Sequence, residues 1–123
     1  MCRMRGLTIV VADVSSERFR TALDMAVSQA ALGGRACVFL NGEAVSIVRQ
    51  PIVGWEDEAY AQAGLPTLPE LYAEALDQGV HIVICQSGMQ MTGAEPRDYD
   101  ARVEYAGMVS LLQRLGDDRL VAV

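Results

Sequence analysis

Apolar residues along this chain alternate between two spacings. Short apolar runs typical of strands buried on both faces occur at 7–12, 35–40, 80–85 and 119–123. Between them, apolar residues recur at helical spacing over about 16–32, 68–78 and 101–115. Strands alternating with helices predict an α/β fold. We expect a three-layer α/β/α sandwich with a mainly parallel sheet of four to five strands, in a single domain over 1–123.

Capping and turn residues set the ends of the expected helices. Ser15 or Ser16 begins the first helix, and Gly33 with Gly34 ends it. Residues 67–70 have the form of a capping box and open the second helix. In the third helix we expect five apolar side chains to face inward: Tyr105, Met108, Val109, Leu112 and Leu115.

The pattern loosens between Asn41 and Pro66. Asn41 is placed to cap a short helix that Pro51 then breaks, and a fifth strand is expected near 47–53. Trp55 lies in the irregular part of this segment. Such an insert is typical of a binding loop, a lid or an interface element, and simple surface coverage is an equally good interpretation.

Composition and charge exclude several classes of function. The chain has 123 residues, 51% of them hydrophobic, and a formal net charge of −6. Its field repels phosphate backbones and anionic membranes, so we expect neither a nucleic-acid nor a membrane partner. All ten basic residues are arginines, which excludes Schiff-base chemistry and a P-loop lysine. No apolar run reaches the length of a membrane span or a signal-peptide core.

The cysteines and the one histidine give little material for a metal site. Cys2, Cys37 and Cys85 are odd in number, contain no CxxC pair and are accompanied only by His81. They support neither a disulfide framework nor a zinc site, so we expect no metal and no cofactor, and free thiols in a reducing cytoplasm. Because His81 lies inside an apolar strand, we interpret it as a packed imidazole with one hydrogen bond rather than a catalytic base.

Cys85 is the candidate reactive group. It ends an apolar run, and the following Ser87 to Gln90 has the S-x-x-Q form of a capping box. A thiol just ahead of a helix lies among unpaired N–H donors, which favour its thiolate. The carboxyl ends of parallel strands share one edge, where open α/β sheets bind ligands. We expect these polar residues to meet there with Cys85: Asp13, Asn41, Glu43, Gln86 and Ser87.

Competing catalytic motifs are absent from the sequence. The segment after the first strand lacks the glycines of a nucleotide-binding loop, and Asp98 with Asp100 looks like a solvated turn. Without a general base or a nearby second cysteine, the Cys85 sulfur suits carrying a group better than hydrolysing one. Peroxide reduction through a sulfenic acid is a weaker alternative. From these residues alone, a buried structural cysteine remains as good an interpretation as a functional one.

The chain resembles the DsrE/DsrF-like family of small sulfur-relay proteins over nearly its whole length. The order and spacing of four segments carry the resemblance: 7–33, 38–45, 79–89 and 103–108. It implies a parallel α/β/α sandwich in which Cys85 accepts sulfur as a persulfide, supported by Gln86, Ser87 and the amides that follow at Gly88 and Met89. It also implies homo-oligomers, as trimers or hexamers, with the site near a subunit contact that could include the Trp55 loop.

Two functional hypotheses therefore stand. In the first, the protein is a cytoplasmic sulfur carrier or sulfurtransferase-like protein that exchanges sulfur between donor and acceptor proteins through Cys85. In the second, it is a non-catalytic oligomeric module that binds a small ligand or a partner protein at the carboxyl edge of the sheet. Cys37 and Cys2 match no functional position of the family.

Overall fold

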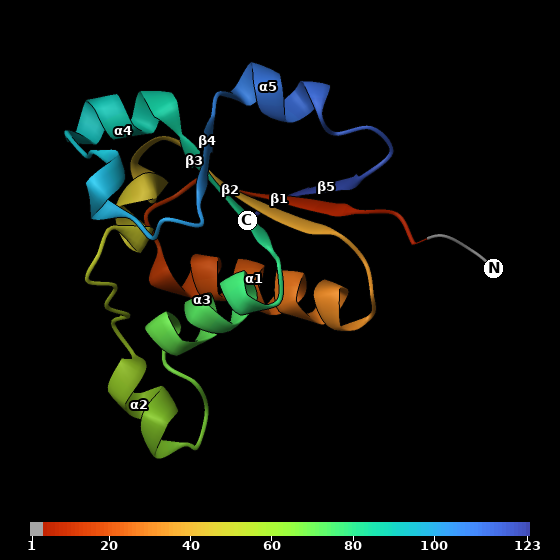
Figure 1. Ribbon diagram of the computed structural model, residues 1–123. Helices are drawn as coiled ribbons and strands as arrows, with labels where there is room; N and C mark the ends of the chain where they lie inside the picture. Colours follow the sequence, from red (N-terminus) through yellow and green to blue (C-terminus); the bar gives the residue numbers. More distant parts are fainter. Residues whose placement is uncertain (1–3) are drawn as a thin grey trace.

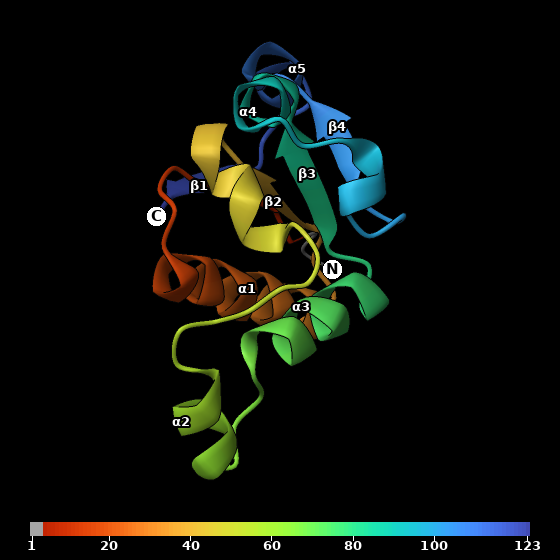
Figure 2. The same ribbon diagram turned by 90° about the vertical axis from the view of Figure 1, so that its left-hand side faces the viewer.

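The computed structural model describes residues 4–123 and is built around one parallel sheet. The strand order is β4-β3-β2-β1-β5. The strands are β1 (Leu7–Val11), β2 (Ala36–Leu40), β3 (His81–Cys85), β4 (Glu104–Ala106) and β5 (Arg119–Ala122). One face carries α1 (Ser16–Ala31) and α3 (Leu68–Asp77), and the other carries α4 (Gln86–Thr92) and α5 (Met108–Gln113) (Figures 1 and 2). The predicted three-layer α/β/α architecture is confirmed.

The register of the central strands explains the core. Ile9 of β1 pairs with Val38 of β2, which pairs with Ile82 of β3, and all three side chains are fully buried. Paired residues of parallel strands point to the same face. This row therefore packs as a continuous apolar layer, which is the outcome expected for a sheet covered on both sides.

The predicted starts of the two long helices are confirmed. The Ser15 side chain accepts a hydrogen bond from the Arg18 N–H at the start of α1. At the start of α3, Thr67 and Glu70 make both hydrogen bonds of a capping box. The short helix expected after Asn41 is a 3-10 helix, η1 (Gly42–Val48), which ends before Pro51 as predicted.

Two expected elements are wrong, one in the last third of the chain and one in its middle. The continuous helix expected over 101–115 is a turn, the edge strand β4 and then the short helix α5. The fifth strand expected near 47–53 is absent there, because η1 and an irregular segment occupy those residues. β4 is the fifth strand instead, and Ala106 pairs with Cys85 of β3.

This error reverses the predicted inward face of the last helix. Leu111 is the buried residue of α5, whereas Met108, Val109 and Leu112 are 37%, 72% and 50% exposed. The helix α5 begins at Met108, after the N-cap Gly107, and Leu111 is the side chain that it turns toward the sheet. The other apolar side chains of this short helix therefore point outward. Tyr105 and Leu115, also expected inward, are half-buried.

The helix α2 (Asp57–Gln62) stands away from the body of the molecule (Figure 2). Three contacts hold its segment against α1. The Arg20 guanidinium lies 3.4 Å from the centre of the Tyr60 ring and donates to the Pro66 carbonyl at 2.6 Å. The Tyr60 hydroxyl donates to Glu17 at 2.9 Å. The α2 segment is therefore anchored to the longest helix of the fold.

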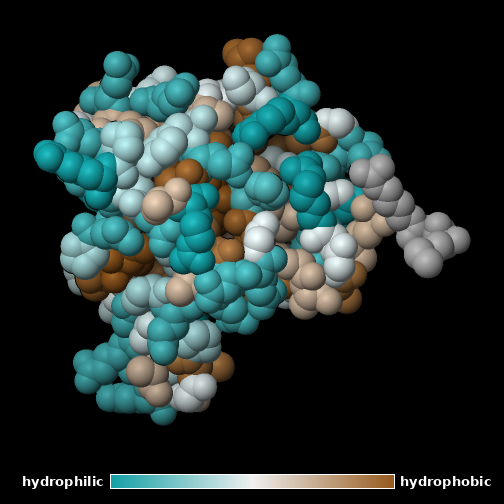
Figure 3. Space-filling view, viewed as in Figure 1, coloured by the Kyte–Doolittle hydropathy of each residue, from teal (hydrophilic) through white to brown (hydrophobic). Residues whose placement is uncertain are grey.

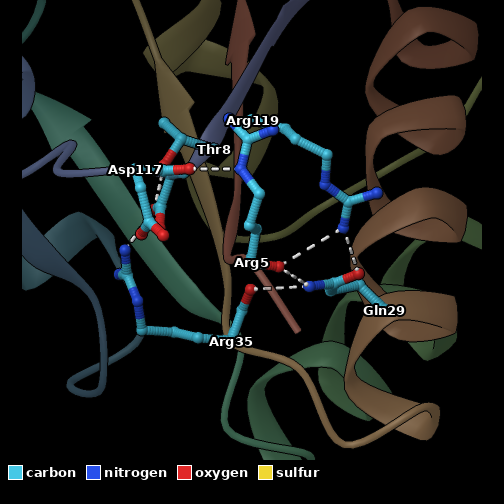
Figure 4. A network of polar contacts seen from close by, with 7 residues as sticks. Arg5, Thr8, Gln29, Arg35, Asp117 and Arg119 are labelled. Carbon is cyan, nitrogen blue, oxygen red and sulfur yellow. Dashed lines mark hydrogen bonds and ion pairs between the residues drawn. The ribbon is translucent and has the colours of Figure 1, made fainter. Parts of the chain in front are cut away.

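Polar contacts close the amino edge of the sheet (Figure 4). The Gln29 side chain, which is buried, donates to the Arg5 carbonyl and accepts from Arg119 at 2.7 Å. Thr8 donates to Asp118 at 2.9 Å. These contacts join the end of α1 to β1 and β5. Cys2 lies outside the described residues.

Polar side chains cover most of the face in Figure 3, and hydrophobic side chains show through only in patches. Across residues 4–123, no helix has both the length and the apolar character needed to cross a membrane.

Candidate functional site

Cys85 is the last residue of β3 and the N-cap of α4. The strand therefore passes into the helix without a loop, and the residue is only 6% exposed. Its side chain makes no capping hydrogen bond. The predicted position at a strand end and helix start is confirmed, but the helix begins at Gln86 rather than at a Ser87 cap. The capping-box interpretation of 87–90 was wrong because Cys85 itself takes the cap position.

Asn41 is the polar residue that the sheet places nearest to Cys85 in register. Leu40, the last residue of β2, pairs with Ile84 of β3. The next residue along each strand is therefore Asn41 on one side and Cys85 on the other, and the two lie level with each other. Its backbone N–H donates to the Val11 carbonyl at 3.0 Å, which keeps it in line with the sheet. Its side chain does not cap η1, so the carboxamide is not used at that helix start. On the other side of Cys85 the register partner is the apolar Ala106.

Gly88 allows α4 to pack closely against η1, the element that follows β2. A Cβ at this position would collide with the Gly42 carbonyl oxygen and lie 3.0 Å from a methyl of Val45. Only glycine allows the two backbones to approach this closely. Gly88, predicted as a supporting residue, therefore contributes packing that holds the start of α4 next to Asn41.

The other predicted site residues contribute less. Gln86 and Ser87 are exposed in the first turn of α4, and Met89 is half-buried against the core. Asp13 is exposed and its carboxylate accepts from the Val14 N–H, as a turn former does. Glu43 is exposed in the first turn of η1.

The edge does not gather the whole predicted polar set around Cys85. Asp13 follows β1, which β2 separates from β3, so two strand spacings of about 5 Å each lie between them. Glu43 has the ordinary position of a carboxylate near a helix N-terminus. Of the residues predicted on the neighbouring strands, Asn41 is the one that the register brings beside the thiol.

His81 is not the packed imidazole that its apolar neighbours suggested. It is the first residue of β3, its side chain is about half exposed, and its Nδ1 lies 2.7 Å from Glu104 Oε2. Arg114 of α5 also donates to Glu104, at 3.3 Å. Partial burial raises the pKa of the Glu104 carboxyl, but these two partners outweigh it and hold the pKa below its ordinary 4.5.

Cys37 lines a small cavity of about 90 Å³ beside His81 and beneath Leu111 of α5. Burial raises the pKa of its thiol to about 11, although Arg114 and Arg35 lower it in part. A thiol with this pKa stays protonated at neutral pH and is a poor nucleophile. Cys37 is therefore a structural cysteine.

The expected solvated turn at Asp98 and Asp100 is instead a pair of ion-paired carboxylates. Asp98 pairs with Arg49 at 3.2 Å, and Asp100 accepts from Arg102 at 3.0 Å. Hydrogen bonds from Arg102 lower the pKa of Asp100. Both carboxylates are half-buried and serve to hold the turn before β4.

A cleft of about 520 Å³ lies at the carboxyl edge, between the start of α1, η1 and the segment that carries Trp55. The Trp55 side chain is 94% exposed. The cleft combines apolar walls with hydroxyl and charged groups, from residues that include Ser15, Ser46, Arg49 and Glu56. The irregular pattern marked Trp55 as a residue of a candidate binding loop. No sequence signal indicated that Ser15 and Ser46, from two other elements, line the same cleft.

No group of three or more His, Cys, Asp or Glu side chains that could hold a metal ion occurs within residues 4–123. Close to Cys85, the groups available for chemistry are its thiol, the carboxamide of Asn41 and the first amides of α4.

Comparison with protein families matches residues 6–122 to the DsrE/DsrF-like family. No curated protein matches the chain.

Several solved structures are similar in fold at low sequence identity. The ychN protein from E. coli is 20% identical with a TM-score of 0.73, covering 98% of this chain and 100% of that one. MTH1491 from Methanobacterium thermoautotrophicum, described as a protein of unknown function, is 13% identical with the same TM-score and coverage. BT1422 from Bacteroides thetaiotaomicron, of unknown function too, is 17% identical with a TM-score of 0.69, covering 96% and 94%.

Proposed function

Because this chain belongs to the DsrE/DsrF-like family, whose name implies a sulfur-relay role, we propose that it is a sulfur carrier in which Cys85 accepts sulfur as a persulfide. The observation that carries the proposal is the place of Cys85, at the carboxyl end of β3 and at the N-cap of α4. Ligands of open α/β sheets bind at this edge. A reducing cytoplasm, where thiols stay free, is the compartment that suits it.

The transfer that we propose is an exchange at sulfur. The Cys85 thiolate attacks the outer sulfur of a donor persulfide, a new S–S bond forms, and the S–S bond of the donor breaks. The donor leaves as a thiolate and takes up the proton that Cys85 lost, so no external oxidant or reductant is consumed. Transfer to an acceptor thiol repeats the exchange with the roles reversed.

Four neighbours are assigned supporting roles. The Asn41 carboxamide, beside Cys85 in register, is the side-chain donor for the terminal sulfur of the persulfide. The backbone N–H groups of Gln86 and Ser87, in the first turn of α4, have no partner within the helix and supply further donors. The contact of Gly88 with Gly42 keeps these groups in place.

Persulfide loading followed by intact-protein mass spectrometry tests this function. In a Cys2→Ser background, treatment with glutathione persulfide is expected to add one sulfur atom to the protein. The Cys37→Ser variant should load equally, because the raised pKa of the Cys37 thiol, about 11, keeps it protonated at neutral pH. Cys85→Ser should not load. Absence of a mass gain at Cys85, under conditions that load a control thiol, would contradict the proposal.

The Trp55 cleft supports a second candidate, a module that binds a small ligand at the carboxyl edge of the sheet. Its volume of about 520 Å³ and its mixed lining are those of a small-molecule site. In this case Cys85 is only a packed residue, so the loading experiment separates the two candidates.

We also propose that copies of the chain assemble as a trimer or hexamer, with dedicated sulfur donor and acceptor proteins as further partners. Support comes from the apolar outer surface of α5, formed by Met108, Val109 and Leu112. Monomeric proteins seldom leave clustered apolar side chains open to water.

A further inference from the structure

A cleft of about 340 Å³ lies beside α3 and shares Pro51 with the cleft at the carboxyl edge. It is bounded by α3, the segment after η1 and the turn before β4. Its apolar wall comes from Pro51, Ile52, Pro69, Tyr72 and Leu76. Both the volume and the apolar lining fall in the range of sites for small molecules.

The α3 cleft and Cys85 belong to opposite faces of the sheet. His81 lines a cavity together with Leu111 and Arg114 of α5, so it points to the α5 side. Alternate residues of a strand share a face, which puts Cys85 of the same strand on that side too. The α3 cleft lies on the side of α1 and α3 and is independent of the proposed sulfur chemistry.

The Tyr72 hydroxyl is a polar group without a partner in the wall of this cleft. The residue is 3% exposed, and no group within residues 4–123 forms a hydrogen bond with the hydroxyl. The ring packs against Phe19 with centroids 6.0 Å apart, which holds it in place. Burial raises the pKa of the hydroxyl, so it remains a neutral O–H donor. A buried donor without an acceptor is costly, and a bound molecule is one explanation for its retention.

Charged groups at the rim restrict the kind of molecule that fits. Asp100 and Arg102 line the cleft together with Tyr72. Arg102 donates to Asp100 from Nε and Nη2, and to Asp77 from Nη1 at 2.7 Å. Its guanidinium is fully engaged, and two carboxylates surround one cation. The rim is therefore net negative and repels anions.

We propose that the α3 cleft binds an uncharged, largely apolar small molecule whose carbonyl oxygen accepts a hydrogen bond from the Tyr72 hydroxyl. The apolar body of the molecule rests between the proline side chains of the cleft, Pro51 and Pro69, and Leu76. Because the hydroxyl oxygen is itself buried, this binding requires the half-exposed Arg102 side chain and Asp100 to shift aside.

Two probes of matched shape isolate the hydrogen bond. Acetophenone carries a carbonyl oxygen, and α-methylstyrene carries a CH₂ group in the same position. Each is titrated into ¹⁵N-labelled protein, and the amide shifts of Ile52 and Ala73 are followed. For molecules of this size we expect dissociation constants on the order of 1 mM.

The preference for acetophenone is compared between the wild type and two variants. Tyr72→Phe keeps the ring and removes the donor, so the ratio of the two affinities should fall by about tenfold. Tyr99→Phe is the matched control: the Tyr99 hydroxyl is also buried without a partner, but Tyr99 does not line this cleft. Its affinity ratio should equal that of the wild type.

Three results would overturn the proposal. The first is an affinity ratio that Tyr72→Phe leaves unchanged, which would mean that no probe accepts from the hydroxyl. The second is a set of shifts that map away from α3 and the segment after η1. The third is the absence of saturable binding by either probe.

Discussion

At the scale of single residues, Gly88 shows how the Cys85 site depends on a contact between two backbones. The α4 helix can begin directly at the end of β3 because it packs on η1, and Gly88 lies at the point of closest approach. The atom that a new side chain would meet is the Gly42 carbonyl oxygen, which is backbone and cannot rotate away.

Gly88→Ala is therefore expected to lower the free energy of unfolding by about 1–3 kcal/mol, the usual cost of overpacking. It should also slow persulfide loading of Cys85, because α4 has to shift. Urea unfolding and the rate of mass gain measure the two effects. Ser87→Ala, at an exposed position of the same helix, is the control and should change stability by less than about 0.5 kcal/mol. Equal stability of the two variants would rule out the steric role of Gly88.

The sequence predicted part of the site at this scale. The position of Cys85 followed from an apolar run and a helix start, which are local signals. Asn41 beside it followed from parallel pairing, whereas Asp13 was placed too close because the order of strands cannot be read from local pattern. His81 was taken as buried because its neighbours are apolar, but it begins its strand, where its ring reaches Glu104 instead of the core.

At the scale of elements, the strand β4 shows how pairing in the sheet overrides a local helical pattern. β4 has three residues, too few to show an alternating pattern, and its apolar residues continue into those of α5 at helical spacing. Pairing with β3 outweighs that local preference, as tertiary contacts often do. The helices α1 and α3 could be predicted without such contacts, because their caps and apolar faces are encoded within each segment.

The ion pairs of Glu104 give the α5 element a pH dependence. The pKa of this carboxyl is lower in the folded protein than its ordinary 4.5, so its contribution to stability is present above that value and is lost as the pH falls through the folded pKa. We expect Glu104→Gln to unfold more easily than the wild type at pH 5, by about 0.5 kcal/mol because the group is partly exposed.

At pH 3 this difference should be smaller, because the carboxyl of the folded protein becomes increasingly protonated as the pH falls and its ion pairs weaken. Urea unfolding at the two pH values measures it. A difference that is as large at pH 3 as at pH 5 would show that the ion pairs with His81 and Arg114 are not its source.

At the scale of the whole molecule, the layered architecture was predictable because alternating strands and helices leave few arrangements that bury both faces of a sheet. The exposed apolar surface of α5 was not predictable in this way. The outer side chains of α5 look like core residues in the sequence, and in the structure they face water. An interface between copies would bury them and account for their apolar character.

Size-exclusion chromatography with light scattering tests this assembly. The wild type should elute as a trimer or hexamer, and Val109→Asp should shift it toward the monomer. Val53→Asp is the matched control, because both valines are 72% exposed but Val53 lies in the Trp55 segment. A monomeric wild type would refute the assembly, and dissociation by Val53→Asp alone would move the interface to that segment.

The anchoring of the α2 segment has a consequence for molecular recognition. Arg20 and Glu17 of α1 hold Tyr60 and Pro66, so the chain on which Trp55 stands is fixed at its far end to a rigid helix. The entropic cost of ordering that segment arises when the protein folds, not when a ligand binds. A ligand that contacts the Trp55 indole therefore meets a preorganised surface, and more of its contact energy remains as binding affinity.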